Sequence, residues 1–76
     1  MIMARIVIDP KIMHGKPVIK GTRVPVDVIL GGLIGGMKYE EIEKEYGVKR
    51  EDIIASIEYA ARFVIGEEVR PLKMKV

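Results

Sequence analysis

The segment spanning residues 15–26 constrains the fold most, because two prolines exclude it from a helix. Pro17 and Pro25 lack a backbone N–H donor, and each biases the residue before it toward extended geometry. A glycine between them, Gly21, can supply a turn. We therefore predict a short β hairpin with its turn at Gly21. Its two edge strands are expected around Val18-Ile19 and Arg23-Val24.

A further strand is predicted upstream, in residues 5–10, where a β-rich run ends at Pro10. Positive charge gathers on this N-terminal part, because residues 1–25 carry five basic side chains against one acidic side chain. Residues 26–66 carry five basic against eight acidic side chains, and the last ten residues are again basic. This distribution can steer a polyanion toward the two ends. The alternative is an ordinary soluble surface of mixed charge.

Three helices are predicted after the hairpin, because the apolar residues change to a helical period from residue 26 onward. Acidic residues in the first turn of the second and third helices suit the helix dipole. The helices are expected from Pro25 or Val26 to Gly35 or Gly36, from Lys38 to Gly47, and from Lys49 to Gly66. The residues expected to enter the core are Val26, Ile29, Leu30, Leu33, Ile34 and Met37 on the first helix, and Ile53, Ile54, Ile57, Ala60, Ala61, Val64 and Ile65 on the third.

Glycines lie inside the first predicted helix. Gly31, Gly32 and Gly35 each cost about 1 kcal/mol relative to alanine unless something compensates. Their spacing leaves a groove of small residues, so we expect another backbone to pack closely there. A flexible hinge is the alternative.

The second and third helices, with a glycine turn between them, make a helix-turn-helix pattern, which often presents a helix to the DNA major groove. Plain packing of two helices gives the same pattern. Glu51 and Asp52 at the start of the third helix count against groove reading, because they would meet the phosphates. We predict a mainly α fold with a small β element, in which an N-terminal strand and short β hairpin precede a three-helix, helix-turn-helix-like unit of the homeodomain or winged-helix kind.

A second apolar stripe lies on the third predicted helix, opposite the expected core. Ala55, Tyr59 and Phe63 recur there every four residues, with Arg62 beside them. These four residues are the candidate interface with another subunit or a partner protein. The alternative is that the N-terminal hairpin covers the stripe.

Length limits the stability of this chain. Its 76 residues form one domain that buries only about 60% of its unfolded surface, and no cysteine is present to form a disulfide. We therefore expect at least a homodimer. Residues 1–66 are predicted to form the domain, with the β hairpin in residues 1–25 and the helices in residues 26–66. Residues 67–76 are predicted to be a basic C-terminal tail.

Composition also indicates a source and a compartment. The chain has no Asn, Gln or Trp, and 32% of its residues are charged, a balance typical of thermophilic proteins. The longest uncharged run, residues 28–37, falls well short of the roughly 20 residues that cross a bilayer. We expect a soluble, cytoplasmic protein that does not contact a membrane.

Several short motifs together resemble the domain-of-unknown-function family 433. They are Asp9-Pro10, Gly15-Lys16-Pro17-Val18-Ile19, Gly21-Thr22-Arg23-Val24-Pro25-Val26, Gly36-Met37, Glu40-Glu41-Ile42, Tyr46 and Glu51-Asp52-Ile53. The resemblance implies a small helix-turn-helix-like domain with an N-terminal β hairpin. Members are often regarded as VapB-like antitoxins of type II toxin–antitoxin pairs, whose partner is a PIN-like nuclease. The chain departs from the family at Lys38 and Lys49, where Ser or Thr helix caps are usual.

The sequence does not favour an enzyme. His14 is the only histidine, and no nucleophile can be paired with it to form a catalytic triad. Gly15-Lys16 and Gly21-Thr22 lack the spacing of a phosphate-binding loop. We predict no catalytic residue, no metal site, no cofactor and no small-molecule substrate.

Arg23 is the most informative single side chain in the hairpin. Its planar guanidinium can bind a phosphate or a partner's carboxylate, but it can also form a local ion pair with Asp27 or Asp9, which we favour slightly. If double-stranded DNA is bound, the phosphate contacts are expected at Lys11, Lys16, Lys20, Arg23, Lys49 and Arg50.

Two functions follow from these features. In the first, the chain is a dimeric DNA-binding antitoxin that neutralises a PIN-like nuclease toxin and represses its own operon. The hairpin and the helix-turn-helix face DNA, while residues 67–76 and the Tyr59-Phe63 stripe bind the toxin. In the second, it is a protein–protein interaction module without DNA affinity.

Overall fold

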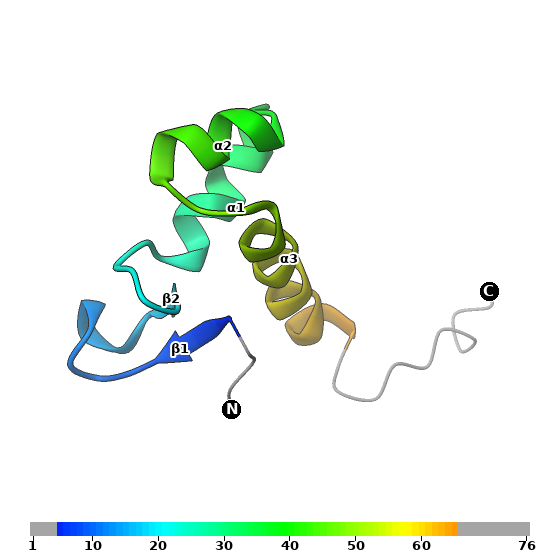
Figure 1. Ribbon diagram of the computed structural model, residues 1–76. Coiled ribbons are helices and arrows are strands. Elements are labelled where there is room, and N and C mark those ends of the chain that lie inside the picture. The colour runs from blue at the N-terminus through cyan, green and yellow to red at the C-terminus, as the bar shows by residue number, and fades with distance from the viewer. Residues whose placement is uncertain (1–4, 66–76) are drawn as a thin grey trace, which may run out of the picture.

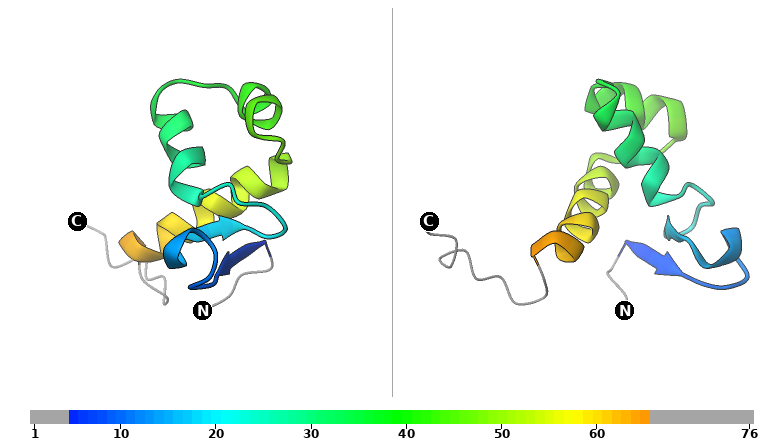
Figure 2. Two further views of the ribbon diagram at one scale, coloured as in Figure 1. Left: turned by 90° about the vertical axis from the view of Figure 1, so that its left-hand side faces the viewer. Right: turned by 180° about the vertical axis from the view of Figure 1, so that it is seen from behind.

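The structure is a computed structural model that describes residues 5–65. A small antiparallel sheet is followed by three helices (Figure 1), which confirms the predicted mainly α fold with a small β element. The elements are β1 (Ile6–Ile8), a 3-10 turn (Met13–Gly15), β2 (Pro17–Ile19), α1 (Val26–Ile34), α2 (Tyr39–Tyr46) and α3 (Arg50–Ile65). Figure 2 shows α3 running beside both the sheet and α1, and it contacts β1, α1 and α2. No helix within residues 5–65 is long and apolar enough to cross a bilayer.

The sheet pairs β2 with β1 rather than with the segment that follows β2. Ile6 lies opposite Ile19, and Ile8 lies opposite Pro17. The predicted hairpin is therefore only partly right, because its second arm makes a single bridge between Val18 and Pro25. That arm cannot extend further, since Pro25 has no N–H to donate and α1 begins at the next residue.

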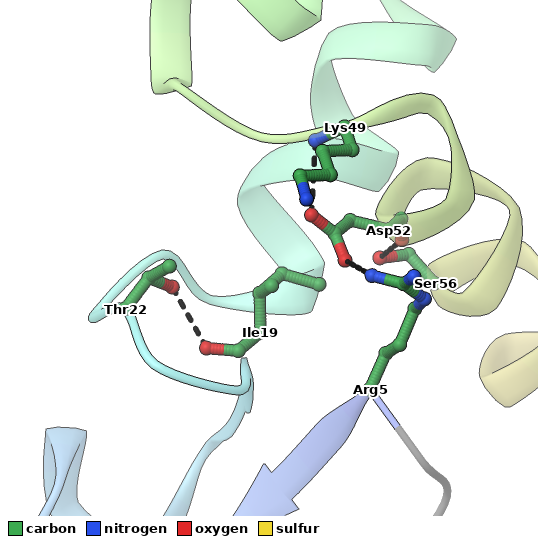
Figure 3. A network of polar contacts seen from close by, with 6 residues as sticks. All are labelled: Arg5, Ile19, Thr22, Lys49, Asp52 and Ser56. Atoms are coloured by element: carbon green, nitrogen blue, oxygen red, sulfur yellow. Dashed lines mark hydrogen bonds and ion pairs between the residues drawn. The ribbon is translucent and has the colours of Figure 1, made fainter.

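The turn after β2 accounts for Gly21, Thr22 and Val24 of the motif that spans residues 21–26. Gly21 has φ +81°, a backbone conformation that favours glycine. The N–H of Thr22 donates to the carbonyl of Ile19 at 3.0 Å, and the Thr22 hydroxyl donates to the same carbonyl at 2.8 Å (Figure 3). The hydroxyl also accepts the Val24 N–H at 2.9 Å. This side chain therefore holds both ends of the turn.

Helix α1 ends at Ile34 with Gly35 as its C-cap, close to the predicted end at Gly35 or Gly36, and it closes in a Schellman motif. Gly36 has φ +95°, and its N–H donates to Leu33 while the Met37 N–H donates to Gly32. The expected close backbone at the glycine groove is wrong within the described residues. A Cβ on Gly32 would lie 3.1 Å from the Met37 sulfur, and one on Gly31 would meet nothing within 4 Å. Side chains, rather than a backbone, fill the space beside Gly32.

The two lysine-capped helices begin with the same device. A lysine side chain has no acceptor, so it cannot satisfy the free N–H groups of a helix start. Instead, the third helical residue reaches back to the backbone of the lysine. Glu41 accepts the Lys38 N–H at 2.7 Å, and Asp52 accepts the Lys49 N–H at 2.9 Å. Both helices therefore begin where the sequence places them.

The core gathers residues from the sheet and from all three helices. Its buried members are Ile6, Ile19, Val26, Ile29, Ile42, Val48, Ile53 and Ala55, with Val24, Leu30, Leu33, Met37, Tyr39, Tyr46 and Tyr59 packed against them.

The predicted core face of α3 is largely wrong. Ile54, Ile57, Val64 and Ile65 are exposed, as is Ile34 of α1, and Ala60 and Ala61 are half-buried. The helix instead buries Asp52, Ala55 and Ser56 beside Ile53. This face can enter the core because its polar groups are satisfied, since the Ser56 hydroxyl donates to the Asp52 carbonyl at 2.9 Å and Asp52 itself has partners.

Candidate functional site

The six basic residues predicted to contact DNA are all exposed. They do not form one cluster in the chain. Lys11 and Lys16 lie in the connection between β1 and β2, whereas Lys20 and Arg23 lie beyond the other end of β2. Three strand residues separate these two pairs by about 10 Å. Lys49 and Arg50 form the start of α3.

Arg23 does not form the predicted local ion pair. Asp27 is taken by Lys16, whose ammonium lies 3.1 Å from its carboxylate. Asp9 accepts the backbone N–H of Lys11 at 2.9 Å. Arg23 makes no ion pair with another residue in the 5–65 range. The prediction is wrong because Lys16 precedes β2, whose bridge to Pro25 brings it close to the start of α1.

Arg23 differs from the rest of its string because the fold does not use its side chain. Gly21 and Thr22 form the turn, Val24 packs against the core, Pro25 precedes α1, and Val26 is buried. The side chain of Arg23 is exposed, with five N–H donors available. Arg23 is therefore the position in this string at which an external anion can be bound without loss of a structural contact.

Arg50 is engaged within the domain. Its guanidinium carbon lies 4.8 Å from the centre of the Tyr39 ring, which is a cation–π distance. Its nitrogens lie 3.7 Å from the Glu40 carboxylate and 3.9 Å from that of Glu43. A DNA phosphate would have to compete with these contacts.

The outward face of α3 is a poor match for the major groove. Its exposed residues include Glu51, Ile54, Ile57 and Glu58, whereas the exposed Arg50 at its start is already engaged. Carboxylates repel the phosphates that line the groove, and isoleucine cannot donate to base edges. The sequence objection therefore holds for Glu51, which is exposed, but not for Asp52, which is buried.

Asp52 and Arg5 are site-shaping residues that the sequence did not reveal. The Asp52 carboxylate receives the Arg5 guanidinium on one oxygen and the Lys49 N–H on the other, each at 2.9 Å (Figure 3). The Lys20 N–H donates to the Arg5 carbonyl at 2.8 Å. These contacts hold the basic end of the hairpin against α3. The position of Asp52, three residues after Lys49, could have predicted the helix-capping contact, because an acidic side chain at the third helical position can accept the N–H of the residue before the helix.

The connection between the strands has an unusual backbone. Met13 and His14 have φ values of +51° and +58°, and Gly15 follows at +85°. Each non-glycine residue in this left-handed region costs roughly 1 kcal/mol or more. The turn is held by the Gly15 N–H, which donates to Ile12, and by the Lys16 N–H, which donates to Met13. His14 is exposed on this turn.

The four residues of the predicted partner interface do not share one exposed surface. Ala55 does not face outward but is buried in the core, because α3 turns this side toward β1 and the helices. Tyr59 is half-buried and meets Phe63 edge to face, with ring centres 5.2 Å apart. Arg62 and Phe63 are exposed. The predicted tail, residues 67–76, lies outside the described residues.

Comparisons with known proteins place the domain among uncharacterised relatives. A family model described as "Protein of unknown function (DUF433)" matches residues 6–60. The chain is 72% identical over 25 residues to an uncharacterized protein of Archaeoglobus fulgidus. The matched stretch covers 33% of this chain and 69% of that protein. It is also similar to the X-ray crystal structure of Rv2018 from Mycobacterium tuberculosis, with a TM-score of 0.63 and 31% identity over 68% of this chain. The match covers only 24% of the Rv2018 chain.

Proposed function

We propose, from the premise that this chain belongs to the DUF433 family of proteins of unknown function, that it is the DNA-binding antitoxin of a type II toxin–antitoxin pair. In this role it acts as a dimer, neutralises a PIN-like nuclease and represses its own operon. The observation that carries the proposal is the exposed Arg23, which forms no ion pair within residues 5–65 and is held on a turn that the Thr22 hydroxyl fixes.

Phosphate is the chemistry that this hairpin suits. The Arg23 guanidinium can donate two parallel hydrogen bonds to a phosphate, and the exposed Lys20 ammonium in the same turn can add a second positive charge. Lys11 extends the positive charge to the other end of β2, where Lys16 is paired with Asp27. We assign DNA contact to this edge of the hairpin rather than to α3, where Glu51 and Glu58 are exposed and Arg50 is already engaged.

Toxin binding is assigned to the exposed end of α3. Phe63 is exposed there, and exposed aromatic side chains are typical of residues that dominate protein interfaces. Ala55 is withdrawn from this surface because it is buried.

The second candidate function is a protein–protein interaction module without DNA affinity. The exposed Ile54 and Ile57 beside Glu51 and Glu58 favour it, because such a surface suits a protein better than DNA. The ion pairs of Arg50 with Glu40 and Glu43 also favour this function, because they compete with a DNA phosphate.

Binding of duplex DNA across a salt series separates the two functions. The antitoxin predicts affinity that falls steeply between about 50 and 200 mM salt, because phosphate contacts release counterions. The matched control is Lys44→Ala, which removes an exposed positive charge from α2. We expect Arg23→Ala to weaken binding and Lys44→Ala to leave it unchanged. Binding that is undetectable at every salt concentration would leave only the interaction module.

Neutralisation of a nuclease tests the other half of the proposal. A PIN-like nuclease found in the neighbouring gene is the substrate of this test, and its RNA cleavage is measured with increasing amounts of the full chain. We expect stoichiometric inhibition that Phe63→Ala weakens. Unchanged cleavage in the presence of excess chain would reject the toxin partner.

A further inference from the structure

Helix α3 carries a second apolar face that the elements within residues 5–65 leave partly exposed. Ile54, Ile57, Ala61 and Val64, here called the outer α3 stripe, follow one another at intervals of three, four and three residues. Ile54 is 42% exposed, Ile57 is 37% exposed and Val64 is 86% exposed. Single exposed apolar residues are common, but a continuous row on one helix marks an interaction surface.

The spacing of the stripe identifies the shape of its occupant. Apolar residues that alternate at three and four residues form the seam along which two helices pack lengthwise. The stripe covers ten residue steps, so the seam is about 15 Å long. A second helix with the same spacing is the complementary surface, and α3 of another copy supplies one.

We propose that a second copy of this chain packs on the outer α3 stripe, with the two α3 helices antiparallel about a two-fold axis. This inference rests on the dimer that the proposed antitoxin requires, and it names the surface that forms it. In the antiparallel register, Ile57 of one copy lies against Ala61 of the other, and Ile54 lies against Val64. A large residue then meets a small one in the two central layers, which lets the helices approach closely. A parallel pair would set Ala61 against Ala61 and leave a gap.

Charges beside the stripe agree with this arrangement. Glu58 and Arg62 lie on the same edge of α3 and are both exposed, and they form no ion pair with each other. A two-fold axis across antiparallel helices brings this edge of one copy against the same edge of the other. Glu58 of each copy then lies near Arg62 of the other, and the pair is made twice. A stripe flanked by carboxylates alone would have required a basic partner instead.

The dimer also accounts for the acidic and apolar character of α3 in a helix-turn-helix-like fold. The face that would read the groove is covered by the second copy. The two basic hairpins are then related by the same two-fold axis, which suits the symmetry of a palindromic DNA site.

Sedimentation equilibrium of the full chain tests the interface. We expect the wild type to be a dimer at about 100 μM, with Val64→Glu shifting it to a monomer by raising the Kd at least tenfold. Ile34→Glu is the matched control, because Ile34 on α1 is exposed to the same 86% and lies outside the stripe. Unfolding midpoints confirm that both variants remain folded. A monomeric wild type, or a dimer that Val64→Glu leaves intact, would overturn the proposal.

Cysteine cross-linking tests the direction of the helices, because the chain has no native cysteine. The Ile54→Cys and Val64→Cys variants are expected to form a disulfide with each other when mixed. Ile54→Cys alone is expected not to cross-link, since the two sites lie about 15 Å apart in the antiparallel pair. The opposite result would show a parallel pair and overturn the register. Neither experiment depends on DNA or nuclease. A dimer that survives Val64→Glu rejects the α3 surface alone, whereas a monomeric wild type also removes the dimer from the proposed function, whose DNA and nuclease binding are judged by their own tests.

Discussion

The guanidinium of Arg5 lies 2.9 Å from the carboxylate of Asp52, although 47 residues separate them in the chain. Asp52 is 7% exposed, and its second oxygen caps the start of α3 through the Lys49 N–H. One side chain therefore joins β1 to α3 and also begins α3. It fixes the orientation of the basic hairpin relative to the three helices.

Replacement of Asp52 is expected to destabilise the fold strongly. Asp52→Ala removes the acceptor of the Lys49 N–H and the partner of Arg5, at a cost of about 2–3 kcal/mol. Urea unfolding monitored by circular dichroism measures the change.

A double-mutant cycle separates the two contributions of Asp52. Arg5 is 42% exposed on its side chain, so solvent weakens the ion pair, and we expect a coupling energy with Arg5→Ala of about 1 kcal/mol or less. The remainder belongs to the helix cap. An Asp52→Ala variant as stable as the wild type would show that the network is not formed.

Two glycine-to-alanine substitutions are expected to change the free energy of unfolding in opposite directions. Gly31→Ala lies inside α1 with open space around its Cβ, so it should stabilise the fold by about 0.5–1 kcal/mol through helix propensity. Gly21→Ala also meets no atom, but its φ of +81° should cost about 1–2 kcal/mol. Urea midpoints with unchanged m-values measure both. Equal effects of the same sign would contradict the backbone assigned to the turn.

Thr22 and Arg23 are neighbours with different roles. Thr22→Val keeps the shape of the side chain but removes both hydroxyl hydrogen bonds, so we expect a loss of about 1–2 kcal/mol in the free energy of unfolding. Arg23→Ala should change that free energy by less than about 0.5 kcal/mol, because the fold does not use its side chain. Thermal unfolding of the two variants makes the comparison. A large loss for Arg23→Ala would assign it a structural role.

Much of the fold could be predicted from the sequence. Helix ends followed from glycines, as the Schellman motif at Gly36 shows, and the motif string led to the family that the comparisons confirm. The cause is local, since φ > 0 at a helix end or turn is a property of one residue.

The core-facing side of α3 could not be predicted by counting apolar residues. Its buried face contains Asp52 and Ser56, whose polar groups are satisfied by Arg5, Lys49 and the helix itself. That satisfaction depends on a contact between distant parts of the chain, which no local pattern reports. Ile54 and Ile57 therefore lie on the outer surface of α3.

The pairing of Asp27 was missed for a related reason. Arg23 is close to it in sequence, whereas Lys16 lies 11 residues away and reaches it because β2 bridges to Pro25. The same bridge leaves Arg23 exposed. The candidate site is thus an outcome of the tertiary arrangement rather than of charge spacing.

The most direct test of the account is the salt dependence of duplex DNA binding for two arginine variants. Fluorescence anisotropy gives the slope of log Kd against log salt for the wild type, Arg23→Ala and Arg50→Ala. We predict that Arg23→Ala lowers the slope by about one unit and that Arg50→Ala leaves it unchanged, because Glu40, Glu43 and Tyr39 already occupy the Arg50 guanidinium. A slope that falls with Arg50→Ala and stays constant with Arg23→Ala would place DNA on α3 and contradict the account.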